Sequence, residues 1–311
     1  MEKALVLGAS GGMGYSIVKE LLSRGIMVTA FARTREKLEK LFGEEANVTI
    51  FAGDVFQLKD LEEAAEGVDV IYCAVNIPYA NWKEELPVLM ANILQTAEKN
   101  STKLAIVDNI YAYGRSAGTK VSETMIKNPH TKKGNVRLKM ENQVRDSNVP
   151  AIIAHFPDFY GPNAENTSLN YTLLNVVRNK KSSYVGDQKI YREFIYTPDG
   201  AKAIVNLSLH EESYGQNWNI PGHGVISGEE IIKTIREITG YQKGVSTISK
   251  KMIQFLGVFN SQMREVVEMF YLNEEPVLLN GEKYEKLFGR VPSTSYEQGL
   301  KQTIEYMKRN K

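Results

Sequence analysis

Short apolar runs alternate with amphipathic segments through the first half of the chain. The apolar runs have the length of buried strands and lie at residues 4–7, 27–32, 48–51, 70–75, 104–107 and 151–156. The segments between them carry helical periodicity and include residues 35–42, 58–65, 84–98 and 134–146. Such alternation predicts parallel strands joined by crossover helices. We therefore expect a doubly wound α/β architecture that binds its ligand at the carboxyl ends of the strands.

The second half of the chain is less regular. Helical periodicity recurs at residues 169–178, 199–209, 228–239, 262–271 and 295–308. One further strand is predicted at 218–220, where it can rejoin the sheet, and too few strands remain for a second doubly wound unit. We expect a dinucleotide-binding domain of 1–158 plus about 190–222, and a smaller, discontinuous α+β substrate lobe of 159–189 plus 223–311.

A glycine-rich loop, Gly8-Ala-Ser-Gly-Gly-Met-Gly14, separates the first apolar run from a segment with apolar residues on one helical face. Glycines also occur in ordinary strand-to-helix turns. In this context, however, free N–H groups and the helix dipole attract phosphate, and the missing Cβ atoms allow close approach. The loop therefore predicts a Rossmann fold that holds a dinucleotide pyrophosphate with Gly8, Ser10, Gly11, Gly12, Met13 and Gly14.

The end of the second predicted strand bears on cofactor choice. Folds that select NAD usually carry an acidic residue here, about 20 residues after the glycine loop, to bind the ribose hydroxyls. No acid occurs between Met27 and Arg35, whereas Arg33 stands at the strand end and can pair with a 2′-phosphate. The sequence favours NADP over NAD, with a merely solvated Arg33 as the alternative.

The Gly-x-x-Gly-x-x-Gly spacing resembles the extended branch of the short-chain dehydrogenase/reductase superfamily. Four further stretches carry the resemblance: Tyr113-Gly114, 159–162, 192–199 and 218–222. Together they are similar to nucleotide-sugar epimerases and dehydratases. The resemblance implies that Asp54 and Val55 lie near the adenine, and that Tyr160 and Arg192 contact the substrate. A salt bridge from Arg192, with Asp199 as a partner, is the structural alternative.

The resemblance also places the catalytic positions, and here the chain departs from the family. The usual Ser or Thr is replaced by Asn109, which can still polarise a carbonyl. With Glu141 aligned to the family's Glu, the Tyr-x-x-x-Lys motif becomes Lys133-x-x-x-Arg137. That spacing puts both cations on one helical face, facing either the cofactor or the solvent.

A competing register, Asn135-x-x-x-Lys139, keeps the Lys but also lacks the Tyr. Three other tyrosines, Tyr111, Tyr113 and Tyr160, are expected on loops near the cofactor and are alternative proton donors. The four histidines show neither metal spacing nor a nucleophile partner, so we expect no metal site and a structural His155.

Composition limits the remaining possibilities. In 311 residues, 38 Lys and Arg nearly balance 37 Asp and Glu, which disfavours binding to nucleic acid or an anionic membrane. No apolar stretch approaches the roughly 20 residues of a membrane span, so we expect a cytoplasmic protein. The only cysteine, Cys73, lies in an apolar run and is expected in the core.

Two functions remain open at this level. The first is an atypical NADP-dependent oxidoreductase or epimerase/dehydratase-type enzyme for a small polar substrate, with nucleotide sugars among the candidates and a homodimer as one possible assembly. The second is a non-catalytic redox sensor similar to NmrA-like regulators, which the absent Tyr favours. The carboxyl-terminal segments at Arg192 and 218–222, which the resemblance assigns to a substrate lobe, favour the enzyme, because a pure sensor need not keep such a lobe.

Overall fold

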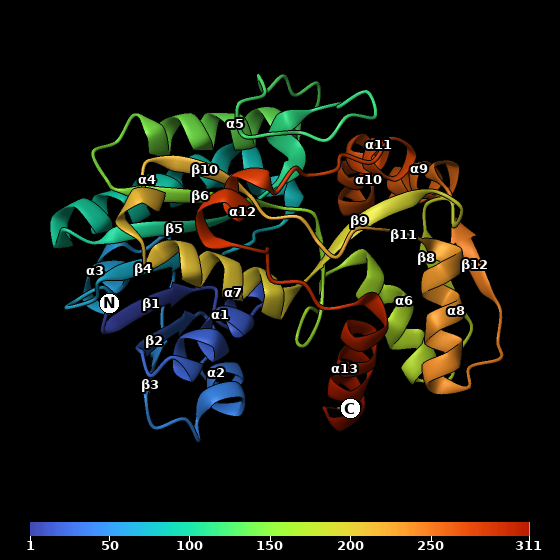
Figure 1. Ribbon diagram of the computed structural model, residues 1–311, viewed down its shortest axis with the longest axis horizontal. Helices are drawn as coiled ribbons and strands as arrows, with labels where there is room; N and C mark the ends of the chain where they lie inside the picture. The colour runs from blue at the N-terminus through green and yellow to red at the C-terminus, as the bar shows by residue number, and fades with distance from the viewer. Residues whose placement is uncertain (311) are drawn as a thin grey trace.

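The computed structural model describes residues 1–310, apart from the side chains at 261 and 262, and centres on a seven-stranded sheet (Figure 1). The strand order is β10-β6-β5-β4-β1-β2-β3, and every neighbouring pair is parallel. The strands are β1 (Lys3–Leu7), β2 (Met27–Ala32), β3 (Val48–Ala52), β4 (Val70–Cys73), β5 (Lys103–Asn109), β6 (Ala151–Phe156) and β10 (Gln216–Asn219). The order reverses between β1 and β4, which is where a doubly wound sheet binds ligands.

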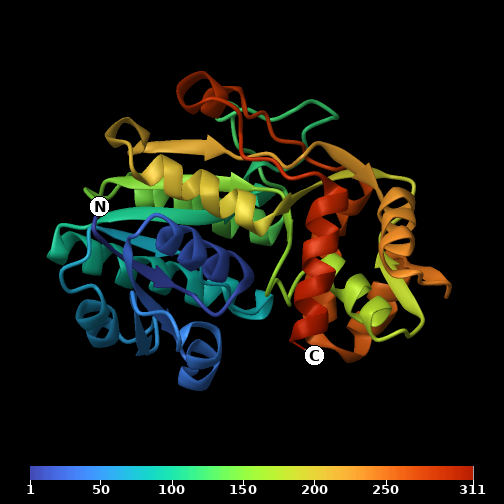
Figure 2. The same ribbon diagram turned by 60° about the horizontal axis from the view of Figure 1, so that its bottom comes forward.

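Helices cover both faces of this sheet, and each face has its own apolar core. One layer contains α1 (Gly12–Ser23), α2 (Arg35–Phe42) and α7 (Thr197–Ser208), and Figure 2 shows α1 and α7 side by side. The other contains α3 (Leu58–Ala64), α4 (Trp82–Asn100) and α5 (Lys132–Arg145). Because the central strands are covered on both sides, their sequences are continuously apolar rather than alternating.

The rest of the chain forms a smaller lobe beside the carboxyl ends of the strands (Figures 1 and 2). It contains a three-stranded sheet, β11-β9-β7, and a two-stranded sheet, β12-β8. The strands are β7 (Asp158–Tyr160), β8 (Ser182–Val185), β9 (Tyr191–Tyr196), β11 (Val225–Ser227) and β12 (Val245–Ile248). The helices are α6 (Ser168–Val177), α8 (Gly228–Thr239), α9 (Lys250–Phe259), α10 (Ser261–Val267), α11 (Tyr271–Glu274) and α13 (Tyr296–Arg309). A further late helix, α12 (Glu282–Phe288), packs on the large sheet beside β10.

Four short 3₁₀ helices connect these elements in the described part of the chain: η1 (Tyr79–Asn81), η2 (Ile110–Tyr113), η3 (Glu211–Ser213) and η4 (Glu268–Phe270). Of these, η1 and η2 follow β4 and β5 on the ligand-binding side of the sheet.

The predicted fold class is confirmed, including the return of one late strand, β10, to the sheet beside β6. The helix predicted over 262–271 is instead divided into α10, η4 and α11. The predicted division of the chain into two domains stays a prediction. Two segments cross it. β9, which lies within the range predicted for the dinucleotide-binding domain, belongs to a sheet of the smaller lobe, and Tyr284 and Val291 belong to the core formed by the large sheet with α1 and α7.

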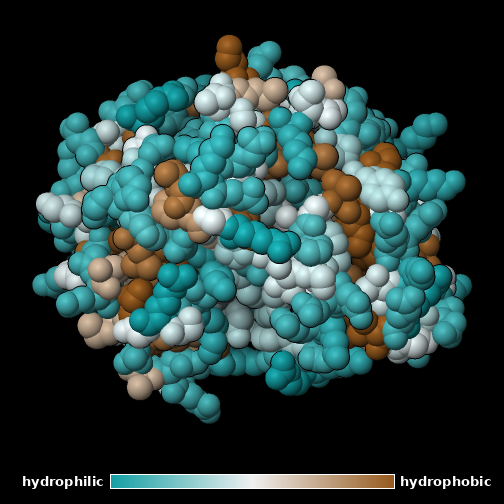
Figure 3. Space-filling view, in the orientation of Figure 1, coloured by the Kyte–Doolittle hydropathy of each residue, from teal (hydrophilic) through white to brown (hydrophobic). Residues whose placement is uncertain are grey.

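The face shown in Figure 3 is mainly hydrophilic, with hydrophobic side chains in separate groups. None of the helices in residues 1–310 is both long and apolar enough to cross a membrane.

Candidate active site

The glycine loop connects β1 to α1, as predicted, and its backbone is tightly folded. Gly8 has φ +80°, and the Gly11 N–H donates to the Gly8 carbonyl oxygen at 2.9 Å. A Cβ on Gly14 would overlap that same carbonyl oxygen. Gly11 offers no side-chain cap, and the first turn of α1 carries no acid in the described structure. The N-terminus of α1 is therefore suited to an anionic phosphate.

A segment of the lobe lies against this loop. The Asn163 Nδ2 donates to the Ser10 carbonyl oxygen at 3.0 Å, and Glu165 pairs with Lys37 at 3.1 Å. Gly12 packs so closely on Ala164 that a Cβ at position 12 would lie 2.7 Å from the Ala164 Cα. The glycine at position 12 is thus required by close packing as well as by any ligand.

The adenosine side of the predicted site lies at the ends of β2 and β3. Arg33 is exposed immediately after β2, and the neighbouring Arg35 pairs with Glu39 at 3.8 Å. Asp54 caps a turn by accepting from the Phe56 N–H at 3.0 Å, and Val55 is buried. None of these three residues lines the cavity that begins at the glycine loop and is described next, so their cofactor contacts stay predictions.

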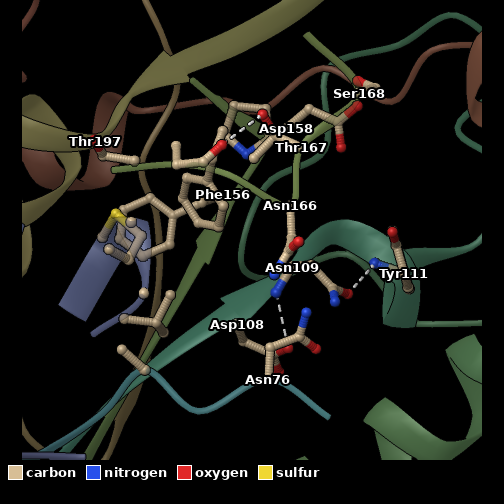
Figure 4. A pocket seen from close by; sticks show the side chains of 18 of the residues that line it. Asn76, Asp108, Asn109, Tyr111, Phe156, Asp158, Asn166, Thr167, Ser168 and Thr197 are labelled. Carbon is tan, nitrogen blue, oxygen red and sulfur yellow. Dashed lines mark hydrogen bonds between the residues drawn. The ribbon is translucent and has the colours of Figure 1, made fainter. Parts of the chain in front are cut away.

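A cavity of about 360 Å³ runs from the glycine loop to the ends of β4, β5 and β6. Figure 4 shows Asn76, Asn109 and Tyr111 on one side of it and Phe156 and Asp158 on the other. The helices α10, η4 and α11, which we call the cap, add three apolar side chains to the lining of this cavity: Val266, Met269 and Leu272.

Asn109 lies at the predicted catalytic position at the end of β5. Its Oδ1 accepts a hydrogen bond from the Tyr111 N–H at 3.0 Å, and its own N–H donates to the Asp108 Oδ1 at 2.7 Å (Figure 4). Because the amide oxygen is engaged, the Nδ2 is the group left to donate to a ligand.

The two α5 residues predicted to face the cofactor, Lys133 and Arg137, are both buried, which excludes the solvated helix face considered from the sequence. Arg137 lines the cavity, where it pairs with Asp108 at 3.2 Å and stacks over Trp82 at 4.3 Å. Lys133 instead pairs with Glu265 and, at 3.1 Å, with Glu268. The structure thus separates the two side chains and commits Lys133 to the cap rather than to the cavity.

The competing register is not supported. Asn135 and Lys139 are both exposed, and the Asn135 Nδ2 donates to the Pro129 carbonyl oxygen at 3.0 Å. Only the register with Lys133 and Arg137 faces the protein interior.

A buried charge cluster extends behind Arg137. The His155 Nδ1–H donates to the Asn109 carbonyl oxygen at 3.0 Å, and Lys127 donates to the His155 Nε2 at 2.7 Å and to Glu141. Burial and the Lys127 charge hold the pKa of His155 well below its usual value, so the imidazole is neutral. Burial, then Asp108, raises the pKa of Glu141 to about 7.

Ligand-type atoms of Asp108, Glu141 and His155 lie within 4.8 Å of one another. The Lys127 ammonium already supplies a cation to this cluster, because it contacts both Glu141 and His155. His155 acts structurally by linking β6 to the last residue of β5.

Arg192 is buried and faces the far end of the cavity. It pairs with Asp158 and donates to the Asn273 Oδ1 at 2.6 Å. The salt bridge considered as the alternative is therefore present, but its suggested partner was wrong, because Asp199 accepts from the Thr294 N–H at 2.6 Å. The two residues diverge because β9 ends between them and Asp199 begins α7.

The tyrosines expected near the cofactor have different surroundings. Tyr160 is 1% exposed in the lobe core, stacked on Tyr296, so its predicted substrate contact is not supported. Tyr113 is buried and donates to the Asn219 Oδ1 at 2.7 Å. Of these three tyrosines, Tyr111 alone lines the cavity. Its hydroxyl lies 2.6 Å from that of Tyr79, another lining residue, which sequence reasoning missed.

Tyr79 could have been found from its position in the chain, shortly after β4, because the ends of β4 and β1 form the switch point of the sheet. Trp82, Asp158 and Asn273 were missed as well. Their place in the site depends on contacts with Arg137 and Arg192, which no short sequence motif predicts.

Comparison with known proteins identifies the family and the fold of the chain. Residues 8–184 match the model of a protein family described as NAD(P)H-binding. The chain is 22% identical to a UDP-N-acetyl-alpha-D-glucosaminuronate decarboxylase of Bacillus cytotoxicus, with 99% of this chain and 98% of that protein covered.

Solved structures share the fold along the whole chain. A dTDP-glucose 4,6-dehydratase of Bacillus anthracis in complex with NAD matches with a TM-score of 0.82 at 18% identity, covering 100% of this chain and 98% of that one. A UDP-glucuronic acid 4-epimerase of Bacillus cereus, in complex with UDP-glucuronic acid and NAD, matches with a TM-score of 0.80 at 19% identity over 99% and 100% of the two chains. The resemblance predicted from the sequence is confirmed.

Proposed function

Because the chain belongs to the NAD(P)H-binding family and has the fold of the extended short-chain dehydrogenases/reductases, we propose that it transfers hydride between a nicotinamide dinucleotide and a small polar substrate. The observation that carries this proposal is the continuity of the cavity. One space joins the N-terminus of α1 to Asn109, so a dinucleotide anchored by its phosphates can present its nicotinamide to the polar end of β5.

The chain's own residues divide the work of cofactor binding. The N–H groups of the first turn of α1, together with Ser10, hold the pyrophosphate, and Gly8 and Gly14 keep the loop close enough to permit it. The bound cofactor supplies or accepts the hydride. We assign the contact with the nicotinamide ribose to Arg137, because it lines the cavity together with Asn109 and the residues of the glycine loop.

We assign NADP rather than NAD. Arg33 is exposed at the end of β2, where it can pair with a 2′-phosphate, and Asp54 and Val55 follow the adjacent strand near the adenine. The two matched structures described above contain NAD. A preference of this chain for NADH would therefore place it with those structures and remove the assigned role of Arg33.

Asn109 polarises the reacting oxygen, since its Nδ2 is the free end of an amide fixed by Tyr111. The polar end of the substrate faces Asp158, Arg192 and Asn273. A nucleotide diphosphate would have to separate Arg192 from the Asp158 carboxylate, which repels it. Nucleotide sugars are nevertheless the first substrates to test, because the matched UDP-glucuronic acid 4-epimerase binds UDP-glucuronic acid. Smaller carbonyl compounds, which need not displace Asp158 from Arg192, are the second group.

The test has two parts. Titration with NADPH and NADH, followed by nicotinamide fluorescence, measures the affinity for each cofactor. A panel of nucleotide sugars and small carbonyl compounds then shows whether NADPH is oxidised or hydride is exchanged. Tight binding without turnover over the whole panel would overturn the enzyme in favour of the sensor similar to NmrA-like regulators.

A further inference from the structure

The proposed reaction requires a proton donor, and the chain lacks the usual one. The residue at the position of the family's Tyr is Lys133, and its ammonium is held by Glu265 and Glu268 under the cap. Asn109 can donate a hydrogen bond but cannot give up a proton. The inference below rests on the proposed function and concerns the group that replaces this donor.

The ionisable residues that line the cavity are few: Lys37, Tyr79, Asp108, Tyr111, Arg137, Asp158, Glu165 and Arg192. The two guanidinium groups stay protonated, so they cannot act as acids. Their partners, Asp108 and Asp158, are held as the acceptors of those ion pairs. Lys37 and Glu165 pair with each other beside the glycine loop, away from Asn109. The two tyrosines remain.

Tyr79 and Tyr111 form a compact phenol pair at the mouths of two adjacent strands. Their hydroxyl oxygens lie 2.6 Å apart, and their rings meet edge to face with centroids 6.4 Å apart. Tyr79 belongs to η1 after β4, and Tyr111 belongs to η2 after β5. Trp82 supports both rings, with centroids 4.9 Å from Tyr79 and 6.0 Å from Tyr111.

The backbone ties this pair to the group that polarises the substrate. Tyr111 follows Asn109 by two residues, and its N–H fixes the Asn109 Oδ1 at 3.0 Å. A carbonyl oxygen bound to the Asn109 Nδ2 is therefore presented to the same short segment that carries the Tyr111 phenol. Tyr111 thus lies in the cavity close to Asn109 in the chain, and Tyr79, hydrogen-bonded to it, can replace a proton that Tyr111 gives up.

We propose that Tyr111 is the general acid for carbonyl reduction in this site and that Tyr79 reprotonates it. The carbonyl carbon accepts hydride from the reduced nicotinamide, which becomes oxidised. The C=O π pair moves onto the oxygen, which takes the Tyr111 proton. The Tyr111 phenolate then takes the proton of Tyr79 through the hydrogen bond between their hydroxyls, and Tyr79 recovers a proton from water.

The protonation state of the pair suits this role. Burial raises the pKa of both phenols above their ordinary value, so both carry their protons at neutral pH. The charged groups that face them are Arg137, Asp158, Glu268 and Lys133, the last over the Tyr79 ring at 5.6 Å. A neutral phenol is the form that can donate its proton to the alkoxide that develops when a carbonyl is reduced.

The test uses Tyr111→Phe and Tyr79→Phe in the full chain, with the exposed Tyr171→Phe as a matched control. With a carbonyl substrate found in the panel, Tyr111→Phe should lower kcat for reduction by about 10² to 10³-fold, the usual range for general acid catalysis. Tyr79→Phe should lower kcat for reduction by about tenfold, because water can still reprotonate Tyr111 but does so more slowly than Tyr79. The control should retain wild-type kcat, and all three should keep NADPH affinity within about twofold.

A second measurement is independent of turnover. In protein labelled at the tyrosine Cζ with ¹³C, the Tyr111 resonance, assigned from its absence in Tyr111→Phe, should shift in Tyr79→Phe and stay in place in Tyr171→Phe. An unchanged resonance in Tyr79→Phe would overturn the phenol pair. If the wild-type protein turns over and Tyr111→Phe is fully active, Tyr111 is not the proton donor and the proposed function stands. If the wild-type protein is inactive over the whole panel, both the proposed function and this inference are refuted.

Discussion

The buried carboxyl group of Glu141 should make the stability of this protein fall as the pH rises. Burial, then the charge of Asp108, raises the pKa of Glu141 from 4.5 to about 7, despite the contact with Lys127. A carboxyl whose pKa is raised by folding contributes stability that is complete below pH 4.5 and is lost as the pH rises through 7. At about 1.4 kcal/mol per pH unit, that interval corresponds to about 3 kcal/mol.

Glu141→Gln removes this dependence, because an amide resembles the protonated carboxyl and does not ionise. Urea unfolding between pH 5 and pH 9, followed by fluorescence of the buried Trp82 and Trp218, gives the free energy of unfolding. The free energy of unfolding of the variant minus that of the wild type should rise by up to about 3 kcal/mol from pH 5 to pH 9.

Two variants control the experiment. Glu193, whose pKa burial also raises to about 7, lies in the other lobe, so Glu193→Gln should remove a second, additive share of the pH dependence. The exposed Glu98→Gln removes one charge without changing a buried group. A difference between Glu141→Gln and wild type that stays constant from pH 5 to pH 9 would refute the reasoning.

Three further predictions follow from the site. Gly14→Ala should abolish NADPH binding in a fluorescence titration, because its Cβ overlaps the Gly8 carbonyl oxygen, whereas Gly244→Ala, with open space around its Cβ, should bind normally. Arg33→Ala should weaken NADPH binding about tenfold and leave NADH binding unchanged, and equal losses for both cofactors would contradict the 2′-phosphate assignment. Arg137→Met should lower the free energy of unfolding by about 3 to 5 kcal/mol, because it leaves the buried charge of Asp108 unpaired, and a loss below 1 kcal/mol would count against that pair.

The large sheet was predictable because its local signals agree. Each central strand contains a run of consecutive apolar residues, since helices cover both faces, and the glycine loop marks where the first strand gives way to a helix. The lobe was harder to predict. β7 and β11 have three residues each, too few to show a period, and α10, η4 and α11 follow one another without a clear break in the sequence pattern.

The site divides in the same way. Asn109 could be placed by counting back from Gly114, because the resemblance at Tyr113-Gly114 lies only a few residues after it in the chain. The fate of Lys133 could not, because Glu265 and Glu268, more than a hundred residues later, determine it. The partner of Arg192 was mistaken for the same reason: nearness in sequence suggested Asp199, and the fold supplied Asp158.

The sequence by itself determined the doubly wound sheet, the phosphate loop and the missing Tyr, because each depends on residues close together in the chain. The tertiary structure alone brought Tyr79 and Tyr111 together from the ends of two adjacent strands, and separated Arg137 from Lys133 on one face of α5. Local periodicity fixes which side of an element is buried. Which charges and hydroxyls meet there depends on distant segments, and that meeting decides the chemistry.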